Sequence, residues 1–290
     1  MEYTEALAKL HGLQRFGVKP GLERVGELLR RLGDPQLAPG RRYVHIAGTN
    51  GKGSCGAMLQ AMLLAADRSV GFFSSPHLLH HCERYRINGR PLSENDFARL
   101  FGLIWPQIES MTAEGWESPT EFEAVTALSL LAFEQARAEW AIMECGLGGL
   151  YDSTNIIRAE LALITNIALD HMDYLGSTIP EIAAQKAGII HPGLQVVTAA
   201  AAPALEVIGE QAASCGDRLL SYDEDFSAVV LEDSDCGLTL DIRTAAKEYR
   251  ELRLPLLGSF QAENAACAVQ AAELLGLDER AIRQGLGETC

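Results

Sequence analysis

A glycine-rich loop between an apolar run and a helical pattern constrains this chain more than any other feature. The apolar run is Tyr43–Ala47, the loop is Gly48-Thr-Asn-Gly-Lys-Gly-Ser54, and residues 54–66 repeat apolar side chains at helical spacing. Such a loop can turn backbone N–H groups toward phosphate oxygens, while Lys52 offsets their charge and the Ser54 hydroxyl reaches Mg²⁺. A glycine separates this lysine from the serine, whereas the ordinary P-loop has them adjacent. The pattern predicts a strand, a phosphate-binding loop and a helix; the alternative is a glycine-rich turn with a solvated lysine.

Other short apolar runs alternate with helical patterns along the chain. They are Val70–Phe73, Trp140–Met143, Leu161–Thr165 and Gln195–Ala199. Strands that lack polar alternation are typical of a parallel sheet covered by helices on both faces. We therefore predict a three-layer α/β domain with a mostly parallel sheet. Ligands of such sheets bind at the carboxyl ends of the strands.

The chain is interpreted as one domain, residues 1–290, with four parts. The parts are an N-terminal helical part (1–35), a P-loop α/β core (40–200), a small antiparallel edge (219–257) and two closing helices (258–290). Capping boxes at Thr120–Glu123 and Thr178–Glu181 predict that helices begin there.

Composition excludes several classes of partner. The formal net charge is −15 and no Lys/Arg cluster is present, so we expect no nucleic-acid partner, and an anionic substrate must meet local positive groups. Seven cysteines without a C-x-x-C pair indicate free thiols in a reducing compartment. The N-terminus lacks the pattern of a signal peptide, and no apolar run approaches about 18 residues. We expect a cytoplasmic monomer with no membrane partner.

Polar residues follow several of the apolar runs. Glu144 is a hard oxygen ligand placed where a Mg²⁺ held by Ser54 would need one; the alternative is a capped strand end. His171 ends another run, and a lone histidine is more often structural than a metal ligand. From composition alone, Lys186 is read as a solvated helix lysine. An ammonium cannot ligate a metal, because it has donors and no acceptor. Asn264 could be a helix-start asparagine without a ligand.

Taken together, these segments resemble the Mur ligase superfamily, and specifically its folylpolyglutamate and dihydrofolate synthase branch. The matching segments, in family order, are His45–Ser54, Phe73–His77, Glu83-Arg84, Ile87–Gly89, Thr120–Glu123, Glu144–Gly149, Asp152–Asn155, Asp170–Met172, Lys186–Ile189 and Gly258–Asn264. The sequence departs from the commoner family pattern at Cys82, Leu150, Gln185 and Phe260.

The resemblance implies roles for particular residues. ATP would be bound by Gly48, Thr49, Asn50, Gly51, Lys52, Gly53 and Ser54, with the amide of Asn264 against the adenine. A first Mg²⁺ would be held by Ser54, Ser75 and Glu144, and a second by Glu144, His171 and a carbamylated Lys186. The catalytic residues would be Lys52, His171 and Lys186, and the folate would lie near Ser74, Pro76, His77, Thr120 and Phe122.

The implied reaction joins L-glutamate to the γ-carboxylate of a folate. ATP would transfer its γ-phosphoryl group to the carboxylate, and the amine of glutamate would attack the acyl phosphate. Whether dihydropteroate is also a substrate stays open. Family members carry a further C-terminal domain, which we expect this chain to lack, so that alone it would be weakly active or inactive.

Three alternatives remain open at this point. The chain could be a Mur-type ligase for peptidoglycan precursors. It could be a nucleotide-binding module without ligase activity. It could also be a general P-loop ATPase that hydrolyses ATP without folate.

Overall fold

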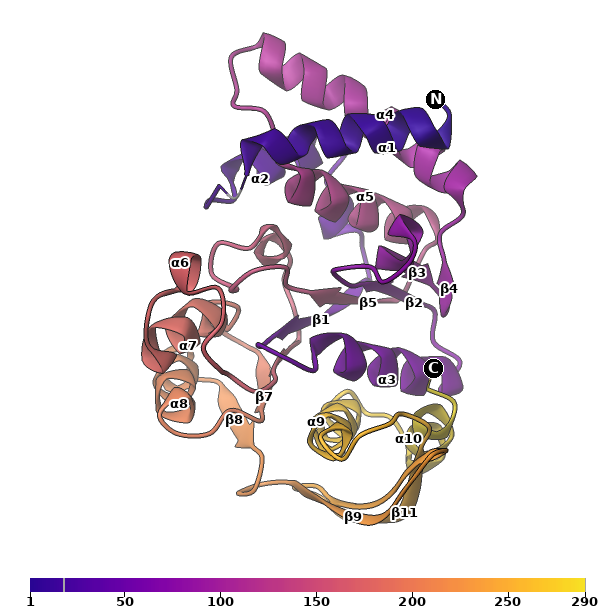
Figure 1. Ribbon diagram of the computed structural model, residues 1–290, viewed down its shortest axis with the longest axis vertical. Helices are drawn as coiled ribbons and strands as arrows, with labels where there is room; N and C mark the ends of the chain where they lie inside the picture. Colours follow the sequence, from indigo (N-terminus) through magenta and orange to yellow (C-terminus); the bar gives the residue numbers. More distant parts are fainter. Residues whose placement is uncertain (18, 290) are drawn as a thin grey trace.

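An eight-stranded sheet forms the centre of the molecule (Figure 1). The structure is a computed structural model, and it describes residues 1–17 and 19–289. Its spatial order is β4-β3-β2-β5-β1-β6-β7-β8. The strands are β1 Arg42–Ala47, β2 Val70–Phe73, β3 Tyr85–Ile87, β4 Arg90–Pro91, β5 Trp140–Glu144, β6 Leu161–Ile164, β7 Gln195–Thr198 and β8 Arg218–Ser221. Neighbours from β2 to β8 are parallel, whereas β3 and β4 add an antiparallel edge. The predicted fold class is confirmed.

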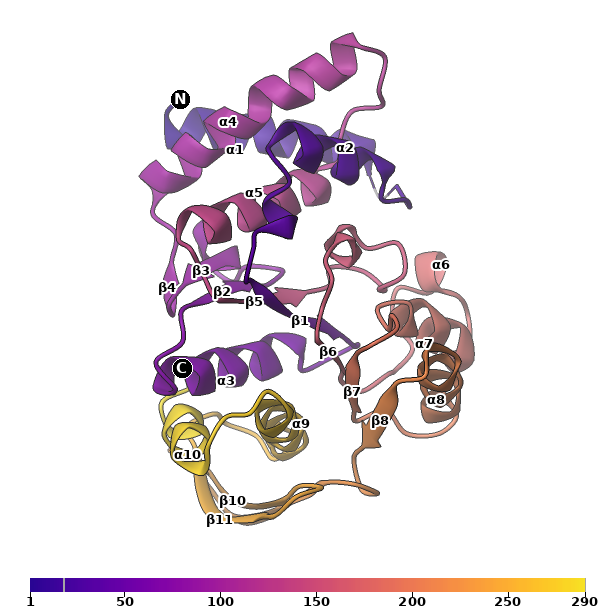
Figure 2. The ribbon, with the colours of Figure 1, turned by 180° about the vertical axis from the view of Figure 1, so that it is seen from behind.

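Helices cover both faces of this sheet, as Figures 1 and 2 show from opposite sides. One face carries α5 (Glu121–Gln135), with α1 (Tyr3–His11), α2 (Glu23–Arg31) and α4 (Glu94–Ala113) beyond it. The other carries α3 (Lys52–Ala65), then α9 (Gln261–Leu274) and α10 (Glu279–Gly287). Helices α7 (Ile179–Ala187) and α8 (Ala204–Cys215) lie beside β6 to β8. Short helical segments are η1 Gly12–Phe16, η2 Pro35–Leu37, η3 His81–Arg84, η4 Ser153–Ile156 and α6 Met172–Leu175.

The central strands are buried on both faces, which is why their sequences lack alternation. In β1, Val44 and Ile46 pack in a core with α3 and α9, whereas Tyr43 faces the core formed by α1, α2, α4 and α5. A smaller core joins β6 and β7 to α7 and α8. Each strand therefore presents apolar side chains to two helical layers.

Three antiparallel strands form a sheet of their own beyond α9 and α10 (Figure 2). They are β9 Ser227–Ser234, β10 Gly237–Arg243 and β11 Glu248–Leu254. The range 219–257 was expected to form antiparallel strands at a sheet edge. Its antiparallel strands form this separate sheet, whereas β8, at the edge of the main sheet, is parallel to β7. The other three strands bury side chains such as Leu240 and Leu252 in one core with the alanines of α9. Small side chains on α9 allow this close layer.

Local details also follow the sequence. Both predicted capping boxes are present, with reciprocal bonds between side chain and backbone at Thr120/Glu123 and Thr178/Glu181. The six cysteines in the described residues are free, and Cys290 lies outside those residues. In the described ranges we find no helix with both the length and the apolar character needed to cross a bilayer.

Candidate active site

The glycine-rich loop joins β1 to α3 and is bonded to the loop after β6. The N–H of Thr49 donates to the carbonyl oxygen of Asn166 at 2.8 Å, and the hydroxyl of Thr165 donates to the carbonyl oxygen of Asn50 at 2.6 Å. Gly48 has a φ of 143°, and a Cβ there would overlap the Thr165 hydroxyl. Only glycine therefore allows β1 and β6 to present the loop in this conformation.

Lys52 stands at the first position of α3 and bends back over the loop. Its Nζ donates to the carbonyl oxygens of Gly48 and Thr49, each at 3.2 Å, and lies 3.9 Å from Oε1 of Glu144. The amine is thus held over the N-terminal end of a helix, where free N–H groups favour anions. This is the arrangement expected of a phosphate-binding lysine.

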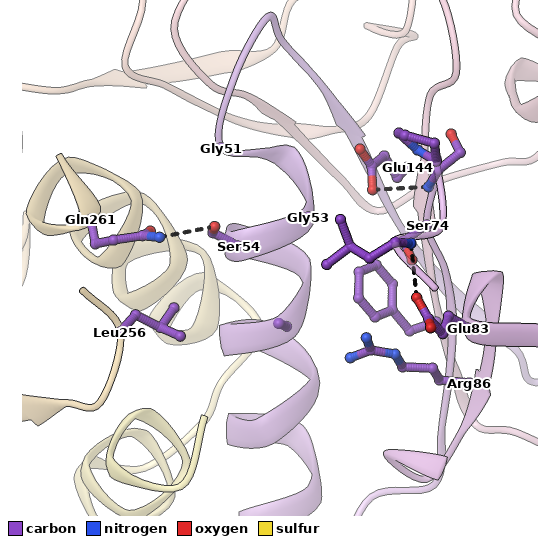
Figure 3. Close-up of a pocket in the computed structure, with 14 residues that line it drawn as sticks. Gly51, Gly53, Ser54, Ser74, Glu83, Arg86, Glu144, Leu256 and Gln261 are labelled. Carbon is purple, nitrogen blue, oxygen red and sulfur yellow. Dashed lines mark hydrogen bonds between the residues drawn. The ribbon is translucent and has the colours of Figure 1, made fainter. Parts of the chain in front are cut away.

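The predicted ligands of the first Mg²⁺ share one pocket of about 400 Å³, drawn in Figure 3. Ser54, Ser75 and Glu144 all line it. The N–H of Ser75 donates to Oε2 of Glu144 at 3.4 Å, and the Ser54 hydroxyl accepts from Nε2 of Gln261 at 3.3 Å. Burial raises the pKa of Glu144 to about 7, against the opposing effect of Lys52.

The donor set suits Mg²⁺ rather than a metal held by protein alone. Within the described part of the chain, no group of three or more His, Cys, Asp and Glu side chains could hold a metal ion. Mg²⁺ commonly uses one or two carboxylates and takes its other oxygens from nucleotide phosphates and water. One carboxylate and two serine oxygens beside the start of α3 fit this pattern.

Lys186 is buried. Composition alone had favoured a solvated side chain at this position, and that reading is wrong. Its Nζ donates to the carbonyl oxygen of Gly48 at 2.8 Å. Burial, together with the positive charge of Lys52, lowers the pKa of Lys186 to about 8. The side chain therefore lies directly beneath the glycine-rich loop.

His171 lies apart from the other predicted ligands of a second metal. It precedes α6 with a φ of 47°, is exposed, and has its Nε2 3.6 Å from a carboxylate oxygen of Asp170. It lines a second pocket, whereas Glu144 lines the first. No contact found among the described residues joins it to Glu144 or Lys186, so the second metal site stays a prediction.

The second pocket, of about 510 Å³, contains several of the residues predicted to lie near folate. It is lined by Pro76, Thr120 and Phe122, together with Lys19, Arg84, Gly146, Leu147, Tyr151, Asp152, His171, Tyr174 and Gln185 among others. Ser75 and Pro76 line both pockets, so the two adjoin at this dipeptide.

The two other predicted folate residues lie near the second pocket without lining it. Ser74 lines the first pocket. Nδ1 of His77 accepts a hydrogen bond of 2.9 Å from Nε of Arg84, which does line the second. The aromatic members Tyr151, in a turn, and Tyr174, in α6, were missed by sequence reasoning, because only the fold brings these two segments together.

A buried polar chain supports the loop that lines the second pocket. Nε2 of His45 donates to the Thr154 hydroxyl at 2.8 Å, and that hydroxyl donates to the Asp152 carboxylate. Asp152 in turn accepts from the N–H groups of Gly146 and Leu147, each at 2.9 Å. Burial lowers the pKa of His45 to about 3, so the ring is neutral. Sequence reasoning missed this role, although a histidine inside an apolar strand is a visible sign of a buried partner.

Asn264 lies on α9 and is buried against the glycine-rich loop. Its Nδ2 donates to Oε1 of Gln261 at 2.9 Å. A Cβ on Gly51, whose φ is 84°, would overlap Oδ1 of Asn264. The amide thus supports the loop from the α9 side, and its predicted contact with adenine remains untested.

Several large apolar side chains are exposed, and some of them line the two pockets. Leu78 and Leu79, after β2, are 90% and 92% exposed. Others lie after β6, at Leu169 and at Tyr174 of α6, and before α9, at Leu257 and Phe260. Of these exposed side chains, Leu78 lines the first pocket and Tyr174 lines the second.

Known proteins are similar to this chain in sequence and in fold. The Mur ligase middle domain family matches residues 46–272. The dihydrofolate synthase/folylpolyglutamate synthase of Bacillus subtilis is 39% identical over 98% of this chain and 67% of its own length. Two solved structures, the apo form of the L. casei enzyme FPGS and an FPGS-AMPPCP-folate complex, both superpose with a TM-score of 0.95 at 34% and 33% identity. Each is covered over 72% of its chain, and all of this chain is covered.

Proposed function

Because this chain belongs to the Mur ligase family, in its folylpolyglutamate and dihydrofolate synthase branch, we propose that it carries the nucleotide and folate sites of an ATP-dependent ligase that adds L-glutamate to folates. The observation that carries this proposal is the junction of two pockets at Ser75-Pro76. One pocket has the groups that bind a triphosphate with Mg²⁺. The other is lined by aromatic rings suited to a flat heterocycle.

The proposed site for ATP and Mg²⁺ is the first pocket. The start of α3 and Lys52 would bind the phosphates, and Ser54, Ser75 and Glu144 would hold Mg²⁺. When bound, the metal offsets the charge that spreads over the phosphoryl oxygens. Lys52 adds a fixed positive charge at the same place. The folate carboxylate attacks the γ-phosphorus, ADP leaves, and the resulting acyl phosphate is attacked by the amine of glutamate with loss of phosphate.

Lys186 is the residue for which we propose a chemical modification. Its lowered pKa gives it a larger neutral fraction near pH 7 than an ordinary lysine has. CO₂ reacts with the neutral amine, and a carbamate would turn this donor into a carboxylate-like ligand. Together with Glu144 and His171 it would form a second Mg²⁺ site, so we propose two metal ions. Carbon-13 NMR with labelled bicarbonate would detect the carbamate.

The folate side follows from the second pocket. Phe122, Tyr151 and Tyr174 offer ring faces and edges for a pteridine. Arg84 and Lys19 line the same pocket and can meet the negative charges of the glutamate tail. Dihydropteroate contains the same ring system, so the test below includes it as a second acceptor.

Leu78 and Tyr174 are exposed apolar side chains of the two pockets, and we propose that a further element covers them. Large exposed apolar patches usually mark surfaces that another segment or protein covers. This chain spans 67% of the length of the B. subtilis relative. The folate synthase names of the relatives favour folate over peptidoglycan precursors. A cytoplasmic location and a monomeric state stay predictions.

The test is folate-dependent incorporation of labelled glutamate with Mg-ATP. It would compare this chain with a form that carries the additional length of its relatives, with Lys52→Ala as the control. Incorporation that is lost in the control supports the ligase, and dihydropteroate in place of folate decides the second acceptor. ATP hydrolysis that ignores folate would instead support a general ATPase. Tight ATP binding without incorporation would support a nucleotide-binding module, or a ligase for muramyl substrates if one of these restores turnover.

A further inference from the structure

A single arginine faces the pocket that contains Ser54 and Glu144. Arg86 lies on β3, and its guanidinium carbon is 5.9 Å from the centre of the Phe72 ring. Figure 3 shows its side chain extending from the strand toward α3, with Glu83 beside it. Among the described residues that line this pocket, Arg86 is the only basic one.

Within the described residues, the guanidinium has no hydrogen-bond or ion-pair partner. Its Nε is buried and makes no hydrogen bond. By contrast, Arg84 on the same segment donates to His77 at 2.9 Å. The neighbouring Glu83 carboxylate bonds the backbone instead of Arg86: it accepts from the N–H groups of Leu78 at 2.9 Å and of His80 at 2.8 Å. A buried donor without a partner calls for an explanation, and a missing ligand is one.

We propose that Arg86 binds an oxyanion, a carboxylate or a phosphate, beside the reacting groups. The inference rests on the proposed ligase function. A guanidinium pairs with either group through two parallel hydrogen bonds. The chain carries a formal net charge of −15, so an anion in this pocket needs a local cation.

An anion bound to Arg86 would lie at a different place from the triphosphate that the glycine-rich loop would bind. The pocket runs from Gly51 and Ser54, at the start of α3, to Ala57 and Arg86. Ala57 lies three residues beyond Ser54, which corresponds to roughly 5 Å along the helix axis. An anion held by Arg86 would therefore sit to the side of the phosphates that the loop binds, with the hydroxyls of Ser74 and Ser75 lining the same space.

Ligation brings two oxyanions to this place. The incoming amino acid has carboxylates, and binding one of them would aim its amine at the acyl phosphate. The acyl phosphate releases inorganic phosphate, and binding this ion would assist its departure. Both are recognised by the same chemistry, so the experiment needs one arm for each.

The experiment is isothermal titration calorimetry on the 290-residue chain loaded with Mg-ADP, with L-glutamate in one arm and inorganic phosphate in the other. Arg86→Met removes the charge, and Arg86→Lys keeps the charge but loses the two-point geometry. Arg90→Met is the matched control, since Arg90 is exposed on the neighbouring strand of the same hairpin and does not line this pocket. Circular dichroism melts establish that each variant is folded.

We expect the wild-type chain to bind one of the two anions, and the arm that shows binding identifies the source. Arg86→Met should weaken that binding at least 10-fold, Arg86→Lys by less, and Arg90→Met less than twofold. Equal loss in Arg86→Met and Arg90→Met, or no loss in either, overturns the proposal. Binding of neither anion while Mg-ADP binds overturns it as well, and leaves the proposed function standing. Failure of Mg-ADP itself to bind counts against the proposed function.

Discussion

The amine of Lys186 donates a 2.8 Å hydrogen bond to the carbonyl oxygen of Gly48, so helix α7 and the phosphate-binding loop share a buried contact. The lysine lies in a place where its positive charge is poorly solvated, and its pKa is lowered to about 8, by burial first and by Lys52 second. The loop thus depends on a group whose protonation changes near neutral pH.

Replacing Lys186 by methionine should remove a pH dependence of stability. The pKa is 10.5 in the reference state and about 8 in the folded protein, so the unfolded chain binds more protons between these values. Stability from this group is therefore present above pH 10.5 and is lost as pH falls through 8, by up to about 3 kcal/mol. Urea unfolding of both proteins should show that the free energy of unfolding of the wild type rises from pH 7 to pH 10 relative to that of Lys186→Met. Parallel curves would contradict the buried lysine.

Glu144→Gln should stabilise the metal-free protein while weakening its function. Burial raises the pKa of Glu144 from 4.5 to about 7, so the folded state binds more protons between these values. Stability from this group is full below pH 4.5 and is lost as pH rises through 7. With EDTA at pH 8 the variant should be more stable by about 1–3 kcal/mol, and the difference should shrink at pH 5. Nucleotide binding by the variant should no longer respond to Mg²⁺; a retained response would remove Glu144 from the metal site.

Gly51→Ala should damage the loop, whereas Gly53→Ala should not destabilise it. At Gly51 the backbone has a φ of 84° and a Cβ would overlap the Asn264 side chain, so we expect a loss of roughly 1–3 kcal/mol. A Cβ on Gly53 would lie 3.6 Å from Oε2 of Glu144, an ordinary contact, and alanine favours a helix by roughly 0.5–1 kcal/mol. Urea unfolding of the two variants measures the contrast. Equal stability would show that Asn264 can move aside without cost.

His45→Phe should weaken folate binding and spare ADP binding. The change removes the donor to Thr154 and so loosens the chain that leads to Asp152 and the loop of the second pocket. Loss of one buried hydrogen bond corresponds to roughly a 10-fold effect on affinity for ligands of that loop. Cys145→Ala is the control, because it removes the thiol contacts to His45 and Thr154 but leaves the His45–Thr154 and Thr154–Asp152 hydrogen bonds in place. Titration of each variant with folate and with Mg-ADP separates the two sites, and a loss of ADP binding as large as that of folate would refute this role.

Several elements could be predicted because their signals are local. The strands β1, β2, β5, β6 and β7 are short apolar runs with clear ends, and two helices begin at capping boxes. Helices α4 and α8 and the hairpin β3–β4 were not predicted. Alternation in the strands after residue 219 identified them as antiparallel, but it could not say that β9 to β11 pack on α9. That choice depends on the alanines of α9, which follows all three strands in the chain.

The site shows the same division. The sequence placed Ser54 in the glycine-rich loop and Ser75 and Glu144 after apolar runs, and the fold brings all three to one pocket. Composition alone favoured a solvated Lys186, although it shares a helix face with Ile182 and Ala183, which are also buried. Tyr151, Tyr174 and Arg86 could not be found from spacing, because a turn, the short helix α6 and strand β3, which are distant in sequence, bring them to the site.

Helix α3 packs against segments that are synthesised much later. The Cys55 thiol donates to the carbonyl oxygen of Asn264, 209 positions along the chain, and Gly285 of α10 lies against the backbone of Met62. On the ribosome, the side of α3 that packs on α9 and α10 therefore has no partner until those two helices have emerged. Contacts between such distant segments form slowly and leave apolar surface uncovered in the meantime. The nucleotide loop begins early in translation, yet its supporting contacts are completed late, so newly made chains would depend on chaperones during that interval.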